Sequence, residues 1–292
     1  AVVPVAMPSD GATPAPIMTA LQAQLEALLA REPGVRIGRD PEELRRMRVA
    51  VRRLRATLRA GREILGSRVV DGLRRELDWL GAALGAVRDV DLVTSYVAAE
   101  VGELSGAARR PGARLLRRLE IDRAHAWDHL LATLDSARYP RLMSRLKTVL
   151  GRAPRRPLAV SLPESAALQW KKVRRAVKRL PARPSAAELH EVRVKVKRAR
   201  YAAELAAGAV GRPADRFVEQ AKRVQDILGE HQDAVVIEEY LHDVIDGREG
   251  AHALEQQLIG RQRKRRKKMR AAFDRRWPKL ERRGRKAWSG AA

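Results

Sequence analysis

ELRRMRVAVRRLRATLR (Glu43–Arg59) and ELHEVRVKVKRARYAAE (Glu188–Glu204) are the two segments of the sequence that decide the fold. The second repeats the pattern of the first at an offset of 145 residues, the distance from Glu43 to Glu188. In both, apolar residues recur at positions i, i+3, i+7, i+10 and i+14, which is the spacing of one face of an α-helix. Each segment is therefore predicted to form a helix with one buried face.

A basic stripe lies about a quarter-turn from the apolar face of each predicted helix. Its members are Arg45, Arg48, Arg52, Arg55 and Arg59 in the first helix, and His190, Arg193, Lys197 and Arg200 in the second. The stripe runs about 21 Å at the α-helical rise. Because it borders the buried face, we expect it to line a cleft between packed helices rather than the far, solvent-facing surface.

A second pair of segments repeats in the same order along the chain. LGAVRD at Leu84–Asp89 returns as LGEHQD at Leu228–Asp233, at an offset of 144 residues. A single deletion between the two blocks accounts for the change of offset from 145 to 144. Two linked blocks in one order indicate an internal duplication.

Four motifs of the chain, taken in order, resemble the CHAD family, the conserved histidine α-helical domain. The motifs are R-V-x-x-R-R-x-R at Arg48–Arg55, L-G-x-x-R-D at Leu84–Asp89, L-H-x-x-R at Leu189–Arg193 and L-G-E-H-Q-D at Leu228–Asp233. The resemblance extends from about Met18 to the C-terminal helix. It implies a pair of pseudo-symmetric four-helix bundles that binds inorganic polyphosphate in a basic cleft. The first-repeat histidine of the family falls on Arg45 here, which keeps the positive charge but departs from the family pattern.

Other cations share helix faces and are predicted to extend the polyphosphate-binding surface. They are Lys171, Arg174 and Lys178 at i, i+3 and i+7, Arg74 and Arg88 fourteen residues apart, and Lys222 on the face of Gly229. Arginine offers forked donors to phosphate oxygens, and lysine offers a point charge. A further dense run, RQRKRRKKMR at Arg261–Arg270, either extends this surface, contacts nucleic acid or remains solvated.

The composition favours a polyanionic partner. The 292-residue chain has 60 Lys and Arg against 35 Asp and Glu, a formal net charge of +25. Its 45% of hydrophobic residues suffices for a sizeable core. The absence of cysteine fits a reducing cytoplasm, and no apolar run approaches the ~20 residues that a membrane helix needs. We expect a cytoplasmic protein, on polyphosphate or other storage granules, with no membrane partner.

The expected fold is all-α, because no segment alternates with period two. The predicted organisation is a flexible leader at 1–16, a first helical bundle at 17–150, a linker at 151–163, a second bundle at 164–284 and a tail at 285–292. Asp40-Pro41-Glu42-Glu43 is typical of a helix start. Helices are expected to stop at Pro33-Gly34, near Leu228, and at Pro278 to Gly284.

We predict non-catalytic binding, with no metal and no cofactor. Polyphosphate cleavage usually needs carboxylates that hold a metal ion, and the predicted cleft has the opposite charge. Three alternatives remain open. The first is nucleic-acid binding, although aromatic residues make up only 4% of the chain. The second is phosphotransfer through His190. The third is a scaffold function, in which the same basic cleft holds a storage granule or a partner protein.

Overall fold

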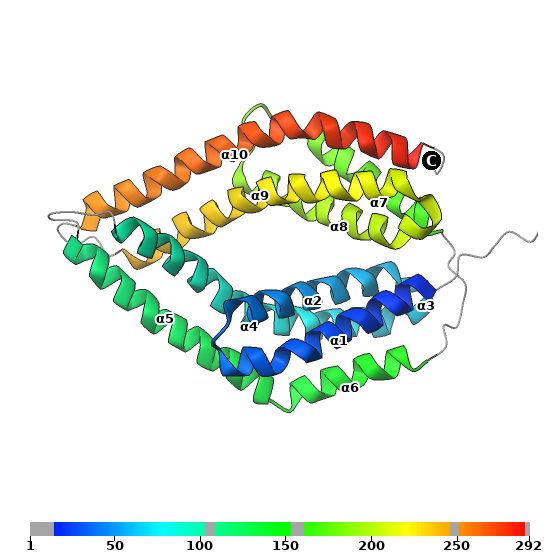
Figure 1. The fold of residues 1–292 in the computed structure, drawn as a ribbon, viewed down its shortest axis with the longest axis horizontal. Helices are drawn as coiled ribbons and strands as arrows, with labels where there is room; N and C mark the ends of the chain where they lie inside the picture. The colour runs from blue at the N-terminus through cyan, green and yellow to red at the C-terminus, as the bar shows by residue number, and fades with distance from the viewer. Residues whose placement is uncertain (1–14, 103–108, 153–160, 246–250, 290–292) are drawn as a thin grey trace, which may run out of the picture.

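The computed structural model describes residues 15–102, 109–152, 161–245 and 251–289, and every regular element in these ranges is a helix (Figure 1). The helices are α1 (Ala15–Ile37), α2 (Pro41–Ala60), α3 (Arg62–Leu65), α4 (Ser67–Val101), α5 (Arg109–Asp135), α6 (Arg138–Leu150), α7 (Leu162–Lys178), α8 (Ala186–Val210), α9 (Arg212–Val244) and α10 (Ala251–Trp288). The two sequence segments that repeat lie in α2 and α8. None of the described helices is long and apolar enough to cross a lipid bilayer.

Local capping fixes the starts of the helices that bear the basic stripes. The Asp40 carboxylate accepts a hydrogen bond from the Glu42 amide at 2.8 Å, and Pro41 opens α2, as the sequence predicts. Ser185 and Glu188 form a capping box at the start of α8. Each of these helices therefore begins with a cap from its own neighbouring residues, which satisfies part of its free amide groups.

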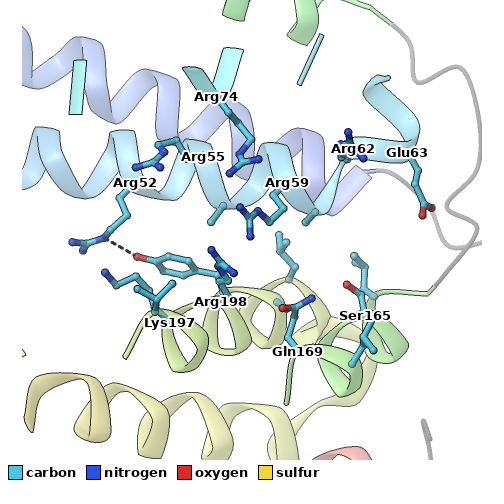
Figure 2. A pocket seen from close by; sticks show the side chains of 18 of the residues that line it. Arg52, Arg55, Arg59, Arg62, Glu63, Arg74, Ser165, Gln169, Lys197 and Arg198 are labelled. Atoms are coloured by element: carbon cyan, nitrogen blue, oxygen red, sulfur yellow. Dashed lines mark hydrogen bonds between the residues drawn. The ribbon is translucent and has the colours of Figure 1, made fainter. Parts of the chain in front are cut away.

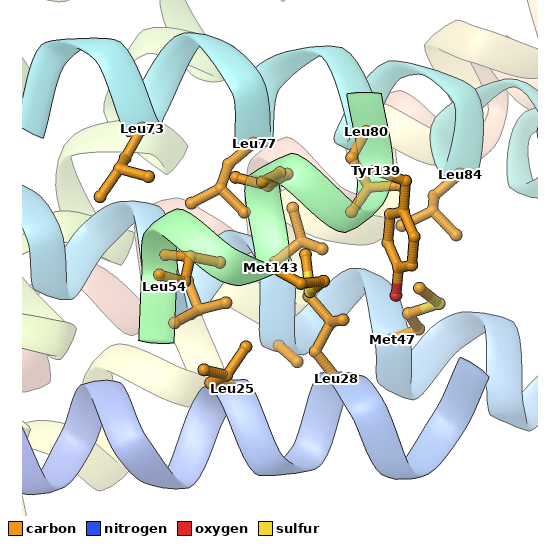
Figure 3. Packing of buried hydrophobic residues seen from close by; sticks show 14 of the residues in the cluster. Leu25, Leu28, Met47, Leu54, Leu73, Leu77, Leu80, Leu84, Tyr139 and Met143 are labelled. Carbon is orange, nitrogen blue, oxygen red and sulfur yellow. The ribbon is translucent and has the colours of Figure 1, made fainter. Parts of the chain in front are cut away.

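The first half of the chain packs around one hydrophobic cluster (Figure 3). Leu25 and Leu28 of α1, Leu54 of α2, Leu77 of α4 and Met143 of α6 all point into it. The leucines are at most 2% exposed. The apolar stripe of α2 faces inward, and this orientation fixes where its basic stripe can lie.

The second half packs around a separate cluster from α7, α8, α9 and α10. Its centre is aromatic: Trp170 of α7 meets Phe217 of α9 edge to face, with ring centroids 5.2 Å apart. Trp288 of α10 meets the same phenylalanine at 5.6 Å. Because α8 contributes Val192 and Val196 to this cluster, its basic stripe turns towards the first half.

A third cluster joins the two halves at one end of the molecule. Val93 of α4, Leu119 of α5, Leu241 of α9 and Leu258 of α10 are all buried there. Figure 1 shows these four helices drawing together at this end, while α5 and α10 run along opposite outer edges. Both long helices, α4 and α9, therefore begin in the packing of their own half and end in the shared cluster.

The structure corrects two of the predicted helix ends. α1 continues through Pro33 and Gly34 to Ile37, and α9 runs unbroken past Leu228. Pro33 lies on the exposed side of α1, and the extra turn buries Val35 completely. The predicted stops were wrong because burial of a large apolar side chain contributes about 1.5–3 kcal/mol, which is comparable with the ~3 kcal/mol cost of an interior proline, so a local breaker does not by itself decide where a helix ends.

The last helix also runs further than the sequence predicts, through Pro278 and Gly284 to Trp288. An interior proline costs about 3 kcal/mol, but Leu280 and Trp288 bury their side chains beyond it and offset that cost. A Cβ atom on Gly284 would overlap the indole ring of Trp170. This glycine therefore serves the close approach of α10 to α7 and does not end the helix.

Candidate functional site

A cavity of about 890 Å³ lies between the two halves of the chain (Figure 2). Helices α2, α3 and α4 line it on one side, and α7 and α8 line it on the other. Its basic lining residues are Arg52, Arg55, Arg59, Arg62, Arg74, His190, Lys197 and Arg198. Glu63 is the one acidic residue among those that line it in the described part of the chain. The cavity therefore has a strongly positive wall.

The positions of these cations follow from the packing of α2 and α8. Arg52, Arg55 and Arg59 follow the buried residues Val51, Leu54 and Leu58 by one position each. When these apolar side chains enter the first cluster, the arginines that follow them are turned about 100° away, towards the second half. Amphipathic helices from the two halves thus bring their basic sides face to face.

Tyr201 of α8 links the two halves at the edge of the cavity. The Arg52 Nε atom donates a hydrogen bond to its hydroxyl group at 3.2 Å, as the dashed line in Figure 2 shows. The guanidinium groups of Arg53 and Arg200 lie 5.7 and 4.5 Å from the centre of the tyrosine ring. These contacts orient Arg52 towards the cavity and hold two further cations close to its wall.

Several cations of the wall have no carboxylate within ion-pair distance among the described residues. They include Arg59, Arg74, Lys197 and Arg198, whereas Arg55 pairs with Asp78. Desolvation lowers the pKa of Arg59, and the like charges of Arg198 and Arg74 lower it further. The wall is therefore a set of mutually repelling cations, and a bound anion would relieve that repulsion.

Lys197 is the most perturbed of these cations. Burial lowers the pKa of its ammonium group to about 7, and the charges of Arg52, Arg193, Arg200 and Arg48 contribute in the same direction. The ammonium group faces the cavity with positive neighbours on both α2 and α8. A phosphate oxygen nearby would offset both causes of the shift, because it supplies negative charge and hydrogen-bond acceptors.

A mixed cluster of arginines and aspartates lies beyond Lys197, between α2, α4, α8 and α9. Burial lowers the pKa of Arg193, and the Asp233 carboxylate opposes the shift. Burial raises the pKa of Asp233, and Arg193 and Arg88 oppose that shift. Asp89 keeps an exposed edge, yet desolvation raises its pKa, and Arg48 counters this effect. None of these residues lines the cavity, and their charges largely offset one another.

The structure brings together six of the fifteen cations that the sequence singles out. Arg52, Arg55, Arg59, Arg74, His190 and Lys197 line the cavity. Those that do not line it are Arg45, Arg48, Arg88, Lys171, Arg174, Lys178, Arg193, Arg200 and Lys222. The assignment of all fifteen residues to polyphosphate binding stays a prediction.

Some of the outlying cations have local partners. Arg45 is tied to Glu42 through two hydrogen bonds, with its side chain 57% exposed. Arg200 pairs with Glu204 and also donates to Gln225. On the exposed outer side of α7, Arg174 lies 3.6 Å from Glu281. Local ion pairs of this kind reduce the charge that is available to an anion.

The sequence analysis did not identify two of the cavity-lining arginines, Arg62 and Arg198. Arg198 lies one position after Lys197, about 100° off the stripe, and reaches the cavity because α2 approaches from the other half. Arg62 follows the helix break at Gly61, at the start of α3. The adjacent lysine and arginine of α8 were a signal for Arg198. Nothing in the local sequence marks Arg62.

The dense basic run of α10 divides into paired and solvated residues. Arg263 and Arg266 both contact the buried Glu238 of α9, and Arg265 lies 3.5 Å from Glu230. The exposed side chains of the run that have no ion-pair partner among the described residues are Lys264, Lys267 and Lys268. Three arginines of the run therefore tie α10 to α9, and its lysines remain on the surface.

Among the described residues, no three His, Cys, Asp or Glu side chains gather as a metal site would require. His190 reaches the cavity wall on its own, and its Nδ1 atom lies 2.7 Å from the Gln232 side-chain oxygen. This contact orients the ring. It leaves the Nε2 atom of His190 as the ring nitrogen for other partners.

The fold and the cavity place the chain in one class of protein. It is an all-helical and strongly basic protein with a cation-lined cavity between its two halves. The family model of the CHAD domain matches residues 19–242, so the chain belongs to the CHAD domain family. The family assignment from sequence motifs is thus confirmed.

Two solved structures share the fold. PptA from Streptomyces chartreusis superposes with a TM-score of 0.75 at 21% identity, covering 91% of this chain and 99% of that one. The CHAD domain from the plant Ricinus communis gives 0.72 at 26% identity, covering 95% and 94%. The all-helical fold class is confirmed by this agreement.

Two curated relatives come from Mycobacterium tuberculosis. Uncharacterized protein MT2285 (strain CDC 1551) is 30% identical over 252 residues, and Uncharacterized protein Rv2226 (strain H37Rv) is 31% identical over 257 residues. Each match covers 80% of this chain and 47% of the relative. The chain therefore spans about half the length of the curated relatives it matches.

Proposed function

We propose that this chain binds inorganic polyphosphate, without cleaving it, in the cavity between its halves. The observation that supports this most directly is the positive wall of the cavity, where Arg59, Arg74, Lys197 and Arg198 have no described carboxylate partner. Polyphosphate presents repeated anionic oxygens and no base edges, so its receptor needs cations more than shape-specific contacts. Each charge-assisted hydrogen bond is worth roughly 1.5–3 kcal/mol.

We also propose that the chain is a duplicated pair of four-helix bundles. In this scheme α2 corresponds to α8, and α4, with 35 residues, corresponds to α9, with 33. The separate hydrophobic clusters of the two halves support it. A duplication would explain why two basic stripes face each other, because α2 and α8 would then be two copies of one amphipathic helix, one on each side of the cavity.

The proposal of binding without catalysis rests on the charge of the cavity. Glu63 cannot by itself hold the divalent ions that polyphosphate hydrolysis usually uses. His190 has a basic counterpart, Arg45, at the same position of the first repeat, which supports a role in charge rather than in covalent phosphotransfer. A cytoplasmic protein that associates with polyphosphate granules is the setting that this function implies.

The decisive experiment compares two variants of equal net charge. Variant one carries Arg52→Glu, Arg59→Glu, Lys197→Glu and Arg198→Glu on the cavity wall. The control reverses four exposed cations on α10, which are Lys264, Lys267, Lys268 and Arg275. Binding of long-chain polyphosphate is measured by fluorescence anisotropy at fixed salt, and circular dichroism checks the fold.

We expect the cavity variant to lose polyphosphate binding and the α10 control to keep most of it. Both variants lower the net charge equally, so a difference reports position rather than long-range attraction. Equal loss in both variants would contradict the cavity as the site and would favour diffuse electrostatic binding. Tight duplex DNA binding that disappears in the cavity variant would instead favour the nucleic-acid function.

A further inference from the structure

The cavity has an apolar portion that polyphosphate does not explain. Leu162 and Leu168 of α7 and Leu205 of α8 line it, together with the polar side chains of Ser165 and Gln169. Leu168 is 50% exposed, and it is one of the three exposed large hydrophobic side chains in the described ranges. Together the three leucines give the cavity an apolar surface, and a ligand that covered it would gain binding free energy.

The unpaired cations of α2 and α8 and the uncharged side chains of α7 lie in different parts of the cavity. Figure 2 shows Arg52 and Lys197 at one end and Ser165 at the other, with Gln169 towards the latter. Arg62 and Glu63 also lie at the Ser165 end, where Arg62 is already paired with Asp71 at 2.7 Å. Arg59 and Arg198 lie between them. A ligand that fills the cavity would therefore place anionic groups at the first end and an uncharged, partly apolar group at the second.

We propose that the cavity binds nucleoside polyphosphates, with the phosphates on the cationic end and the nucleoside on the α7 end. The idea rests on the proposed function, because the phosphates would use the same cations. The face of a base would cover Leu168, and its edge has donors and acceptors that the Gln169 amide can match. Ser165 offers a hydroxyl group to the ribose.

The dimensions and the chemistry of the cavity suit such a ligand. Its volume of about 890 Å³ falls within the 300–1,000 Å³ that small-molecule sites usually have. Small-molecule sites also combine apolar walls with a few placed polar groups, as α7 provides here. A bare phosphate chain would gain nothing from Leu162, Leu168 or Leu205, whereas a nucleoside would bury part of each.

The test compares ATP with tripolyphosphate, which carries the same number of phosphates without the nucleoside. Binding of each to the purified chain is measured by titration calorimetry in EDTA at fixed ionic strength. We expect ATP to bind about tenfold more tightly, a difference of ~1.4 kcal/mol. Leu168→Ser should remove this preference and leave tripolyphosphate affinity unchanged.

The matched control is Ile121→Ser, because Ile121 is a comparably exposed hydrophobic residue (53%) on α5 that does not line the cavity. The control should keep the full preference for ATP. Equal affinity for ATP and tripolyphosphate, no binding of ATP, or an unchanged preference in Leu168→Ser would overturn the inference. Long-chain polyphosphate is titrated in parallel, and its continued binding would show that the proposed function stands although the nucleoside subsite fails.

Discussion

Lys197 predicts that polyphosphate binding weakens as the pH rises from 7 to 9. Burial and the cations Arg52, Arg193, Arg200 and Arg48 lower the pKa of its ammonium group to about 7 in the free protein. A bound phosphate would raise that pKa, because it favours the charged form. Binding therefore takes up a proton above pH 7, and affinity is highest below this pH and falls above it.

The size of the effect follows from the pKa of Lys197. With a value of about 7, the protonated fraction falls from about one half at pH 7 to about one hundredth at pH 9. If the bound phosphate keeps the ammonium group protonated throughout this range, affinity falls about 50-fold, or ~2.3 kcal/mol. The arginines of the wall remain charged, so binding weakens but persists.

The assay is fluorescence anisotropy of end-labelled long-chain polyphosphate between pH 6 and 9 at constant ionic strength, since salt alone changes such affinities. Lys197→Arg is the control, because a guanidinium group stays charged over this range. The ratio of the two affinities cancels the contribution of the other titrating groups, the ends of the anion included. Parallel pH profiles for the two proteins would refute the reasoning.

Three further predictions concern His190, the contact of α10 with α7, and selectivity. His190→Arg should keep most of the polyphosphate affinity, and an acid-labile phosphate on His190 after incubation with a phosphoryl donor would count against this. Gly284→Ala should lower the free energy of unfolding in urea by about 1–3 kcal/mol, because the added methyl group overlaps Trp170. The control is Gly260→Ala, whose methyl group meets no atom within 4 Å and should not destabilise the protein. Long-chain polyphosphate should outcompete duplex DNA, because a chain of phosphates can enter the cavity and contact many cations. A thick duplex can contact only the outer lysines of α10. Equal competition by the two polyanions would contradict the cavity model.

Local sequence determined where several helices begin and which face of each is buried. The Asp40 and Ser185 caps need only residues within their own first turns, and the spacing of apolar residues in α2 and α8 follows from helix geometry alone. The direction of the basic stripes was predictable for the same reason, since a residue's angle on a helix depends only on its position.

The tertiary structure decided how far the helices extend. α1 passes Pro33 to bury Val35, and α10 passes Pro278 and Gly284 to bury Trp288. Proline and glycine are weak evidence for a helix end when distant residues provide a place for the next apolar side chain. The sequence in the neighbourhood of the break does not contain that information.

The residues of the cavity wall were likewise decided partly by the sequence and partly by the tertiary structure. The sequence by itself determined a basic, all-helical chain with two amphipathic helices, and it placed Arg52, Arg59 and Lys197 on the correct side of them. Only the packing of one half against the other added Arg198 and Arg62 and left Arg45 with Glu42 outside. The physical reason is that an angle on a helix is a local property, whereas a cavity exists only where residues far apart in the chain approach each other.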